Sequence, residues 1–420
     1  MRTGRPSYKC NRLQIRQVGF NSVWPGSKMR TLTPNTTKLI ELVGKFCGRV
    51  RCWRAALTHN IAFFAGSLRK QLVRCAPPLL TVHSSVLLPS FLILILAGCR
   101  ENSKSPSGAG VVRVGFLQNI THAQALIAYQ RGDFTAALRS TGFDCTMQAF
   151  QAGPAIIEAI YAGHLDVAYV GPIPALNGYL RSRGQEIRLL SGAAENGTVV
   201  IGNPRRNIRK LEDLCGRRVA TPQMGNTQDL AARYFLGAAG TACRSQKSAD
   251  IVPIAPSDIE ILMAKDQLDG AWVPEPWGSQ LVTKGTGVLL TEEKSLWPDG
   301  RTPLTVVIAR KKFAEEHRDI VSALLDCHTS LTLELRANKE SLVPVLSEAM
   351  HRLTHKPFPE SLVASSLERI EFTTSAHREG LERLVLIARQ LRYMPKNAVR
   401  LDDFFLAQTG QTVTTDKQSP

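Results

Sequence analysis

The chain has 420 residues, of which 44% are hydrophobic, and this length is enough for two domains of ordinary size and a leader. Its formal net charge of +17 is concentrated at one end, because residues 1–99 hold 15 of the 52 Lys and Arg residues but only one of the 35 Asp and Glu residues. The remaining chain carries only +3, which argues against nucleic acid as the ligand of the folded part.

An apolar run of eleven residues, Val86–Leu96, is too short to span a bilayer comfortably and is typical of the hydrophobic region of a signal peptide. Basic residues precede this run, and it ends in Leu-Ala-Gly-Cys, which resembles the bacterial lipobox. We therefore expect a signal peptide over residues 68–98 and lipidation of Cys99. The alternative is a buried strand that happens to end in Cys.

After the leader, segments typical of strands alternate with segments typical of helices, and the loops between them are rich in Gly and Pro. This alternation predicts βαβ units and a parallel sheet. In chain order, the first block has predicted strands at 112–117, 144–150, 166–170 and 187–190, with helices at 122–130, 155–162 and through 176–180.

The pattern repeats in a second block and then gives way to helices. The second block has predicted strands at 218–221, 250–254 and 270–273, with helices at 228–236 and 256–265. Two further strands, 288–290 and 304–309, are expected to return to the first block. The rest of the chain predicts helices at 319–337, 341–353, 360–370 and 378–391.

Two such blocks, the second inserted into the first, predict an α/β protein with two lobes. The leader extends over 1–98, and its first 67 residues are either a misassigned start or a disordered extension. The remaining domains are expected to be a lipidated Cys and tether at 99–110, lobe one at 111–202 plus 302–405, lobe two at 203–301, and a disordered tail at 406–420.

The stretch Arg217–Gly237 reads as strand, turn and helix, with Asn226 or Thr227 as a suitable N-cap. The first N–H groups of a helix have no intrahelical partner, and the helix dipole favours negative charge there. The stretch therefore predicts an anion site at the helix N-terminus. The alternative is a capped helix that binds no ligand.

Ligands of open α/β sheets lie outside the C-terminal ends of the strands. The loops predicted at those ends are rich in Gly, Pro, Asn, Thr and Ser and poor in Lys and Arg, so they would hold an anion through backbone N–H and hydroxyl groups. These loops are 118–122, 151–154, 171–174, 191–197, 222–227 and 273–277.

Six ordered motifs carry a family resemblance that covers about residues 111–340 and, more weakly, the chain to about 405. They are QNITHA at 118–123, AGPAIIEA at 152–159, AGHLDVAYVGP at 162–172, VATPQMGNTQD at 219–229, AWVPEPW at 271–277 and LWPDG at 296–300. Together they resemble the aliphatic-sulfonate branch of the substrate-binding proteins of ABC transporters, which is related to the nitrate, taurine and thiamine-pyrimidine binders.

The resemblance implies the type II periplasmic-binding fold, with two lobes joined by a two-strand hinge, and closure around a small solute. It also implies a monomer that delivers a small anionic solute to an ABC permease in the inner membrane, without a cofactor or metal and without nucleic acid. The ligand-binding residues carried over by matching motifs are Asn119, Thr121, Gly153, Gly171, Gly192, Ala193, Thr221, Gly225, Asn226, Thr227 and Glu275.

Several side chains have two open interpretations. His122 either donates to the anion or faces solvent or the core. Trp272 and Trp277 either wall an alkyl group or pack within a lobe. Glu275 binds a ligand amine or pairs with an Arg at the hinge or across the lobes. Asp229 is most simply a capping acid at a helix start.

The chain shows no P-loop, no GxGxxG after a strand, no HExxH and no GxSxG, so no enzyme is predicted. The rivals are a binder of nitrate, taurine or a thiamine-pyrimidine precursor, and an enzyme or a sensor domain on the same fold. None of the cysteines has CxxC spacing. Cys215 and Cys243 flank one predicted helix and could pair in an oxidising compartment, although spacing alone does not decide the connectivity.

Overall fold

The computed structural model describes residues 110–237, 240, 242–243, 246–394 and 400–406, all within the compact unit Lys104–Pro420. The predicted leader, the lipidation site Cys99, the tether up to residue 109 and the tail from residue 407 lie outside the described residues. Within the described residues, no helix combines the length and the apolar composition that crossing a membrane requires.

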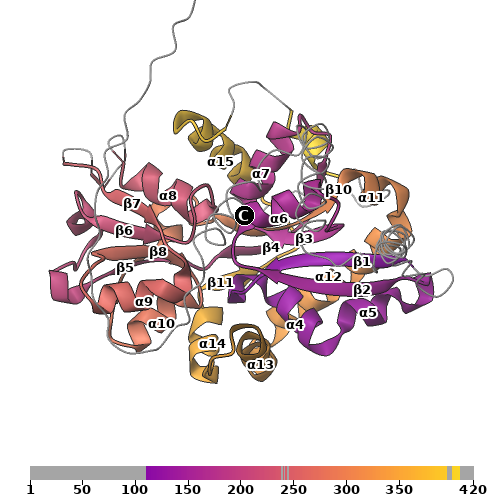
Figure 1. Ribbon diagram of the computed structural model, residues 1–420, viewed down its shortest axis with the longest axis horizontal. Coiled ribbons are helices and arrows are strands. Elements are labelled where there is room, and N and C mark those ends of the chain that lie inside the picture. Colours follow the sequence, from indigo (N-terminus) through magenta and orange to yellow (C-terminus); the bar gives the residue numbers. More distant parts are fainter. Residues whose placement is uncertain (1–109, 238–239, 241, 244–245, 395–399, 407–420) are drawn as a thin grey trace, which may run out of the picture. The chain divides into compact units, whose positions relative to one another are not determined.

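Two sheets organise the fold, as the alternating pattern predicts (Figure 1). The first sheet has the order β11-β4-β10-β3-β1-β2, in which β1 runs parallel to β2 and β3 while β10 lies antiparallel between β3 and β4. Its strands are β1 Val111–Leu117, β2 Asp144–Phe150, β3 Val167–Val170, β4 Ile187–Asn196, β10 Pro303–Arg310 and β11 Ile370–Phe372.

Helices cover both faces of the first sheet, with α4, α5 and α12 on one face and α6, α7 and α15 on the other (Figure 1). Gly132 ends α4 with a φ of +81°, and its N–H donates to the carbonyl of Ala128. The helices that accompany the first sheet are α4 Ala123–Arg131, α5 Asp133–Leu138, α6 Gly153–Tyr161, α7 Pro172–Arg181, α11 Lys311–Glu316, α12 Arg318–Ala337, α13 Val343–Thr354, α14 Glu360–Leu367 and α15 Arg378–Gln390.

The second sheet has the order β7-β6-β8-β5-β9, with β6 parallel to β7 and β8 and with β5 antiparallel to both of its neighbours. A Cys215–Cys243 disulfide, with 5.5 Å between the Cα atoms, lies in the same part of the chain and settles the pairing that spacing left open. The elements are β5 Thr198–Gly202, β6 Arg218–Thr221, β7 Asp250–Pro253, β8 Gly270–Pro274, β9 Val288–Glu292, α8 Thr227–Phe235, α9 Pro256–Ala264 and α10 Trp277–Thr283.

Three segments differ from the sequence expectation. Residues 198–202, expected in the first lobe, form β5 in the second sheet, because this fully buried strand pairs along its length with β8. Residues 288–292 form β9 in the second sheet and do not return to the first. The predicted loop from residue 191 is wrong, because β4 continues to Asn196 by pairing with β10.

The chain passes between the sheets twice, and the two connections lie side by side. One is the turn at Asn196 and Gly197, which have φ values of +63° and +79°, and the other is the segment 293–302. The Asn196 N–H donates to the carbonyl of Thr302 at 2.9 Å, and the Thr302 N–H donates to Asn196 Oδ1 at 3.2 Å. These bonds tie the two connections together, as a two-strand hinge requires.

Candidate functional site

A cavity of about 730 Å³ lies where loops from both sheets meet. Its walls include the loops that follow β1, β2 and β3 of the first sheet and β6, β7 and β8 of the second, at the C-terminal ends of the strands. The predicted site residues that line it are Asn119, Thr121, His122, Gly153, Gly171, Asn226 and Thr227.

Helix N-termini open onto this cavity from both lobes. Ala152 provides no side-chain cap for α6. The first three residues of α7 offer no free N–H group, because Pro172 and Pro174 have none and the Ile173 N–H donates to Thr227 Oγ1. At α8, Asn226 Oδ1 accepts the N–H of Asp229 at 2.8 Å, which confirms Asn226 as the N-cap. The wall therefore presents positive helix ends where a bound anion would be stabilised.

Two buried side chains after β1, Asn119 and His122, add hydrogen-bond donors without adding charge. Thr121 donates to Asn119 Oδ1, which leaves the Asn119 amide nitrogen available to a ligand. His122 Nδ1 accepts the Leu117 N–H at 3.3 Å, so the proton of the neutral ring resides on Nε2. Burial lowers the pKa of His122 to about 3, and the imidazole is therefore a neutral donor at ordinary pH.

The two lobes touch at Gly171 and Thr227. The Ile173 N–H donates to Thr227 Oγ1 at 3.4 Å, and a Cβ atom on Gly171 would lie 2.8 Å from the same oxygen. A larger residue at position 171 would therefore push apart the N-termini of α7 and α8. This close approach explains why position 171 requires a residue without a side chain.

Thr221 and Gly225 lie behind the cavity wall and not in it. Both bind the carboxylate of Asp229, the Thr221 hydroxyl at 3.3 Å and the Gly225 N–H at 3.0 Å. Arg233 Nε and the Tyr393 hydroxyl also donate to this fully buried carboxylate, at 3.0 and 2.5 Å. These residues hold the first turn of α8 in place, and Asp229 acts as the acid predicted at the helix start.

Gly192 and Ala193 are also away from the cavity, because they belong to strand β4 and not to a loop. The Gly192 carbonyl accepts from His328 Nε2 at 2.9 Å, and the Ala193 carbonyl accepts from Gln124 Nε2 at 2.8 Å. Both carbonyl groups thus have hydrogen-bond partners inside the first lobe, away from the cavity.

Glu275 is fully buried outside the cavity lining, and the structure assigns it the second of its two interpretations. Its carboxylate accepts from the N–H and hydroxyl of Ser279, both at 3.0 Å, and pairs with Arg369 at 3.3 Å. Burial raises the pKa of Glu275 despite these donors. Trp272 is likewise buried in packing, whereas Trp277 lines the cavity.

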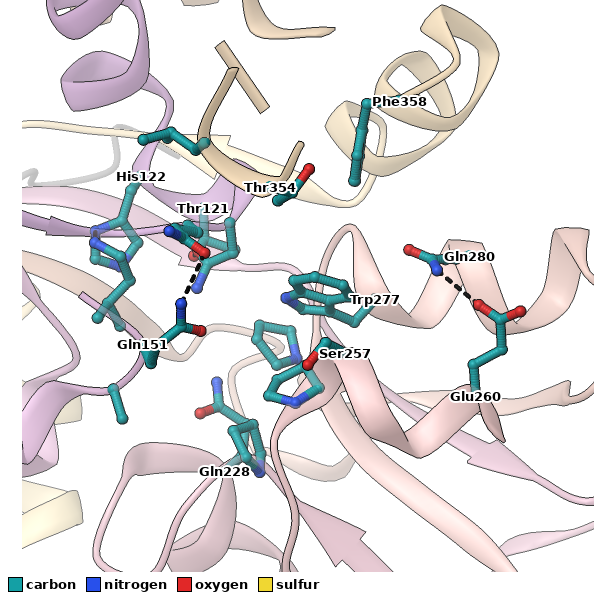
Figure 2. Close-up of a pocket in the computed structure, with 18 of the residues that line it drawn as sticks. Thr121, His122, Gln151, Gln228, Ser257, Glu260, Trp277, Gln280, Thr354 and Phe358 are labelled. Atoms are coloured by element: carbon teal, nitrogen blue, oxygen red, sulfur yellow. Dashed lines mark hydrogen bonds between the residues drawn. The ribbon is translucent and has the colours of Figure 1, made fainter. Parts of the chain in front are cut away.

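Part of the lining was not predicted. The connection between α13 and α14, from Leu353 to Leu362, forms a wall that includes Phe358. Figure 2 shows Trp277 between Thr121, His122 and Gln151 on one side and Gln280 and Glu260 on the other. Gln151 belongs to the predicted loop 151–154, but the connection, Gln280 and Glu260 belong to no quoted motif or predicted loop, and no local pattern places them at the cavity.

Nothing in the described part of the chain resembles a metal centre, since it contains no group of three or more His, Cys, Asp or Glu side chains that could hold an ion. The donors around the cavity are amides, hydroxyls, one neutral imidazole, helix N–H groups and the exposed ammonium groups of Lys284 and Lys356. Such a set suits an anion better than a cation.

The comparisons with known proteins agree with this geometry. The taurine-binding periplasmic protein of Escherichia coli is 27% identical over 187 residues, 44% of this chain and 55% of that protein, so the chain spans about half the length of this relative. Two solved structures also align. The first is the alkanesulfonate-binding protein SsuA of Xanthomonas axonopodis pv. citri bound to MOPS, with a TM-score of 0.58 and 16% identity, over 71% of this chain and 98% of that protein. The second is the nitrate-binding protein NrtA of Synechocystis PCC 6803, with a TM-score of 0.57 and 17% identity, over 70% of this chain and 84% of that protein.

The structural likeness confirms the predicted two-lobed fold of periplasmic binding proteins, and the relatives confirm the resemblance read from the motifs. The family profile described as NMT1-like matches residues 106–345, which is more than half of the chain. The chain therefore belongs to the NMT1-like family.

Proposed function

We propose that the chain is the substrate-binding component of an ABC importer and captures a small organic anion between its lobes, with an aliphatic sulfonate as the first candidate. The observation that carries the proposal is that the N-termini of α6 in the first lobe and of α8 in the second lobe meet around one cavity. Backbone N–H groups and helix dipoles bind oxyanions without a cationic side chain. The polar donors Asn119 and His122 complete that end of the cavity, where the Thr121 hydroxyl orients the Asn119 amide.

An anion that contacts both lobes stabilises the closed arrangement over an open one, since only the closed arrangement supplies both sets of donors. The two hydrogen-bonded connections at Asn196 and Thr302 are placed to act as the hinge of that motion. Relatives that bear the names of taurine and alkanesulfonate binders support the same ligand class.

The location proposed for the chain is the periplasm, with a lipid on Cys99 as the membrane anchor. Binding as a monomer and delivery to a permease in the inner membrane complete the assignment. Cells that express the chain and incorporate a labelled fatty acid test the anchor directly. Cys99→Ser is expected to abolish the label and release the protein from membranes, and a labelled variant would contradict the assignment.

The chain is proposed to bind its solute without transforming it. Of the described residues that line the cavity, none is a cysteine. The single carboxylate of the lining, Glu260, lies across the cavity from His122, with Trp277 between them (Figure 2). A nucleophile and its base must lie within hydrogen-bond reach of each other, and this separation supports binding over catalysis.

Thermal unfolding against alkanesulfonates, taurine, nitrate, sulfate and an aminopyrimidine tests the function. A ligand at about a hundredfold over its Kd stabilises a protein by about 2.7 kcal/mol. Thr121→Val removes the hydroxyl that orients the Asn119 amide and should weaken the best ligand at least tenfold, since a hydrogen bond from that amide to a charged group contributes about 1.5–3 kcal/mol. Thr332→Val removes an equally buried hydroxyl away from the cavity and serves as the control.

The pattern of responses decides the ligand class. Stabilisation by an alkanesulfonate but not by nitrate supports the proposal. A response to the aminopyrimidine alone would leave the fold intact and overturn the anion assignment. Equal losses of affinity in Thr121→Val and Thr332→Val would show that the hydroxyl acts through stability and not through the ligand.

A further inference from the structure

The cavity contains one acidic side chain whose role the anion site does not explain. Glu260, on α9, is half-buried and is the only carboxylate among the described lining residues. Its Oε2 atom accepts from Gln280 Nε2 of α10 at 2.7 Å, and no Lys or Arg of the described chain forms an ion pair with it. The two basic residues of the lining, Lys284 and Lys356, are both exposed to solvent.

A carboxylate in an anion-binding cavity repels the ligand unless a positive group lies between the two charges. The half-buried Glu260 is screened less by salt than the exposed lysines of the rim. A purely anionic solute would therefore bind against this charge. A solute that also carries a cation would bind with its help.

The size and shape of the cavity point the same way. Its volume of about 730 Å³ is in the range of sites for drug-sized molecules, and an inorganic anion would leave most of it to water. Figure 2 places the Trp277 indole between the donors near Thr121 and His122 and the Glu260 side chain. An indole face attracts ligand cations as well as apolar groups, and Phe358 adds an apolar wall.

We propose that the solute is an extended zwitterion, with an anionic head among the helix N-termini and an ammonium or similar cationic group at Glu260. Glu260 is then the residue that selects for the positive end, and Trp277 contacts the linker between the charges. Of the two lobes, the second alone supplies this selectivity, through α9 and α10. The inference rests on the proposed binding of an organic anion and names the class of that anion.

Matched ligand pairs test the inference in the full purified chain by calorimetric titration. Each pair has the same sulfonate and the same carbon skeleton, and one member carries a terminal ammonium: propane- to hexanesulfonates against their ω-amino forms, and 4-methylbenzenesulfonate against its aminomethyl form. Glu260→Gln keeps the size of the side chain and an acceptor for Gln280. Glu315→Gln on α11 removes one exposed acid away from the cavity and controls for net charge.

For at least one pair, the amino form is expected to bind the unaltered chain at least tenfold more tightly than its partner. Glu260→Gln should abolish this preference and leave the affinity for the plain sulfonate equal or higher, whereas Glu315→Gln should keep the preference. Equal binding of the two forms, or a preference that survives Glu260→Gln, would overturn the role of Glu260 while the anion-binding function stands. If no member of any pair binds, the proposed function itself is wrong and the selectivity assignment with it.

Discussion

Replacing Arg369 by Met is expected to destabilise the protein by about 3 kcal/mol, because it leaves the Glu275 carboxylate buried without its cation. Loss of one partner from a buried ion pair costs about 3–5 kcal/mol, and the lower end applies because the Arg369 side chain is 24% exposed. The substitution also removes the bonds from Arg369 Nη1 to the Ser365 carbonyl and the Ser279 hydroxyl, both at 3.0 Å.

Urea unfolding at pH 5 and pH 8 measures this cost. Burial raises the pKa of Glu275 above its ordinary value, and loss of Arg369 should raise it further. A carboxyl with a raised pKa in the folded state loses stability as the pH rises through that pKa, so the penalty in Arg369→Met should be larger at pH 8. The double variant Arg369→Met with Glu275→Gln should lose less stability than the sum of the losses in the two single variants.

Arg400→Met is the matched control, because Arg400 pairs with Asp402 on the surface, where the two side chains are 81% and 49% exposed. Solvent screens such an exposed pair, so its loss should change the stability little. If Arg369→Met cost no more than Arg400→Met, or if the penalties of Arg369→Met and Glu275→Gln were simply additive, the Arg369–Glu275 pair would not be a coupled buried ion pair. The reasoning from burial would then be wrong.

Three further outcomes are expected. The double variant Cys215→Ser with Cys243→Ser should lose about 3.5 kcal/mol of stability, because the disulfide no longer restricts a loop of 28 residues in the unfolded chain. Urea unfolding with and without reductant measures this loss, and no change on reduction would contradict it. Burial raises the pKa of Glu293 from 4.5 to about 7, although two indole N–H groups donate to its carboxylate. Stability should therefore fall as the pH rises from 4.5 through 7, and Glu293→Gln should flatten that dependence; an unchanged slope would refute it. Asn226→Ala should cost about 1 kcal/mol of stability in urea unfolding by uncapping α8, and a neutral effect would show that the cap is dispensable.

Local sequence patterns predict most of the elements because each strand and helix depends on neighbours that are close in the chain. The alternation of strands and helices places β1, β2, β3, β6, β7 and β8 within a few residues of their observed bounds. Helix α5 and strand β11 were missed, since α5 follows Gly132 without a loop and β11 has three residues. Sheet membership of β5 and β9 was missed for a different reason, because pairing partners are chosen by contacts distant in sequence.

The position of the cavity follows from the rule that ligands of open α/β sheets bind outside the C-terminal ends of the strands. The sequence indicates these ends because the loops that follow them are rich in Gly, Pro, Asn, Thr and Ser. Seven of the twelve predicted ligand residues line the cavity, and the other five support it or lie elsewhere. Thr221, Gly225 and Glu275 match the family motifs in sequence, but their side chains or N–H groups turn away from the cavity toward Asp229, Ser279 and Arg369.

The sequence by itself determined the class of fold, the family and the edge of the sheets at which the cavity lies, because periodicity, caps and short motifs are local properties. Only the tertiary structure decided the partner of Glu275, which lies 94 residues away, and the closing of the cavity by Phe358 and Glu260. These contacts join segments with no common local signal. They form because the folded chain must bury apolar surface and give each buried charge a partner.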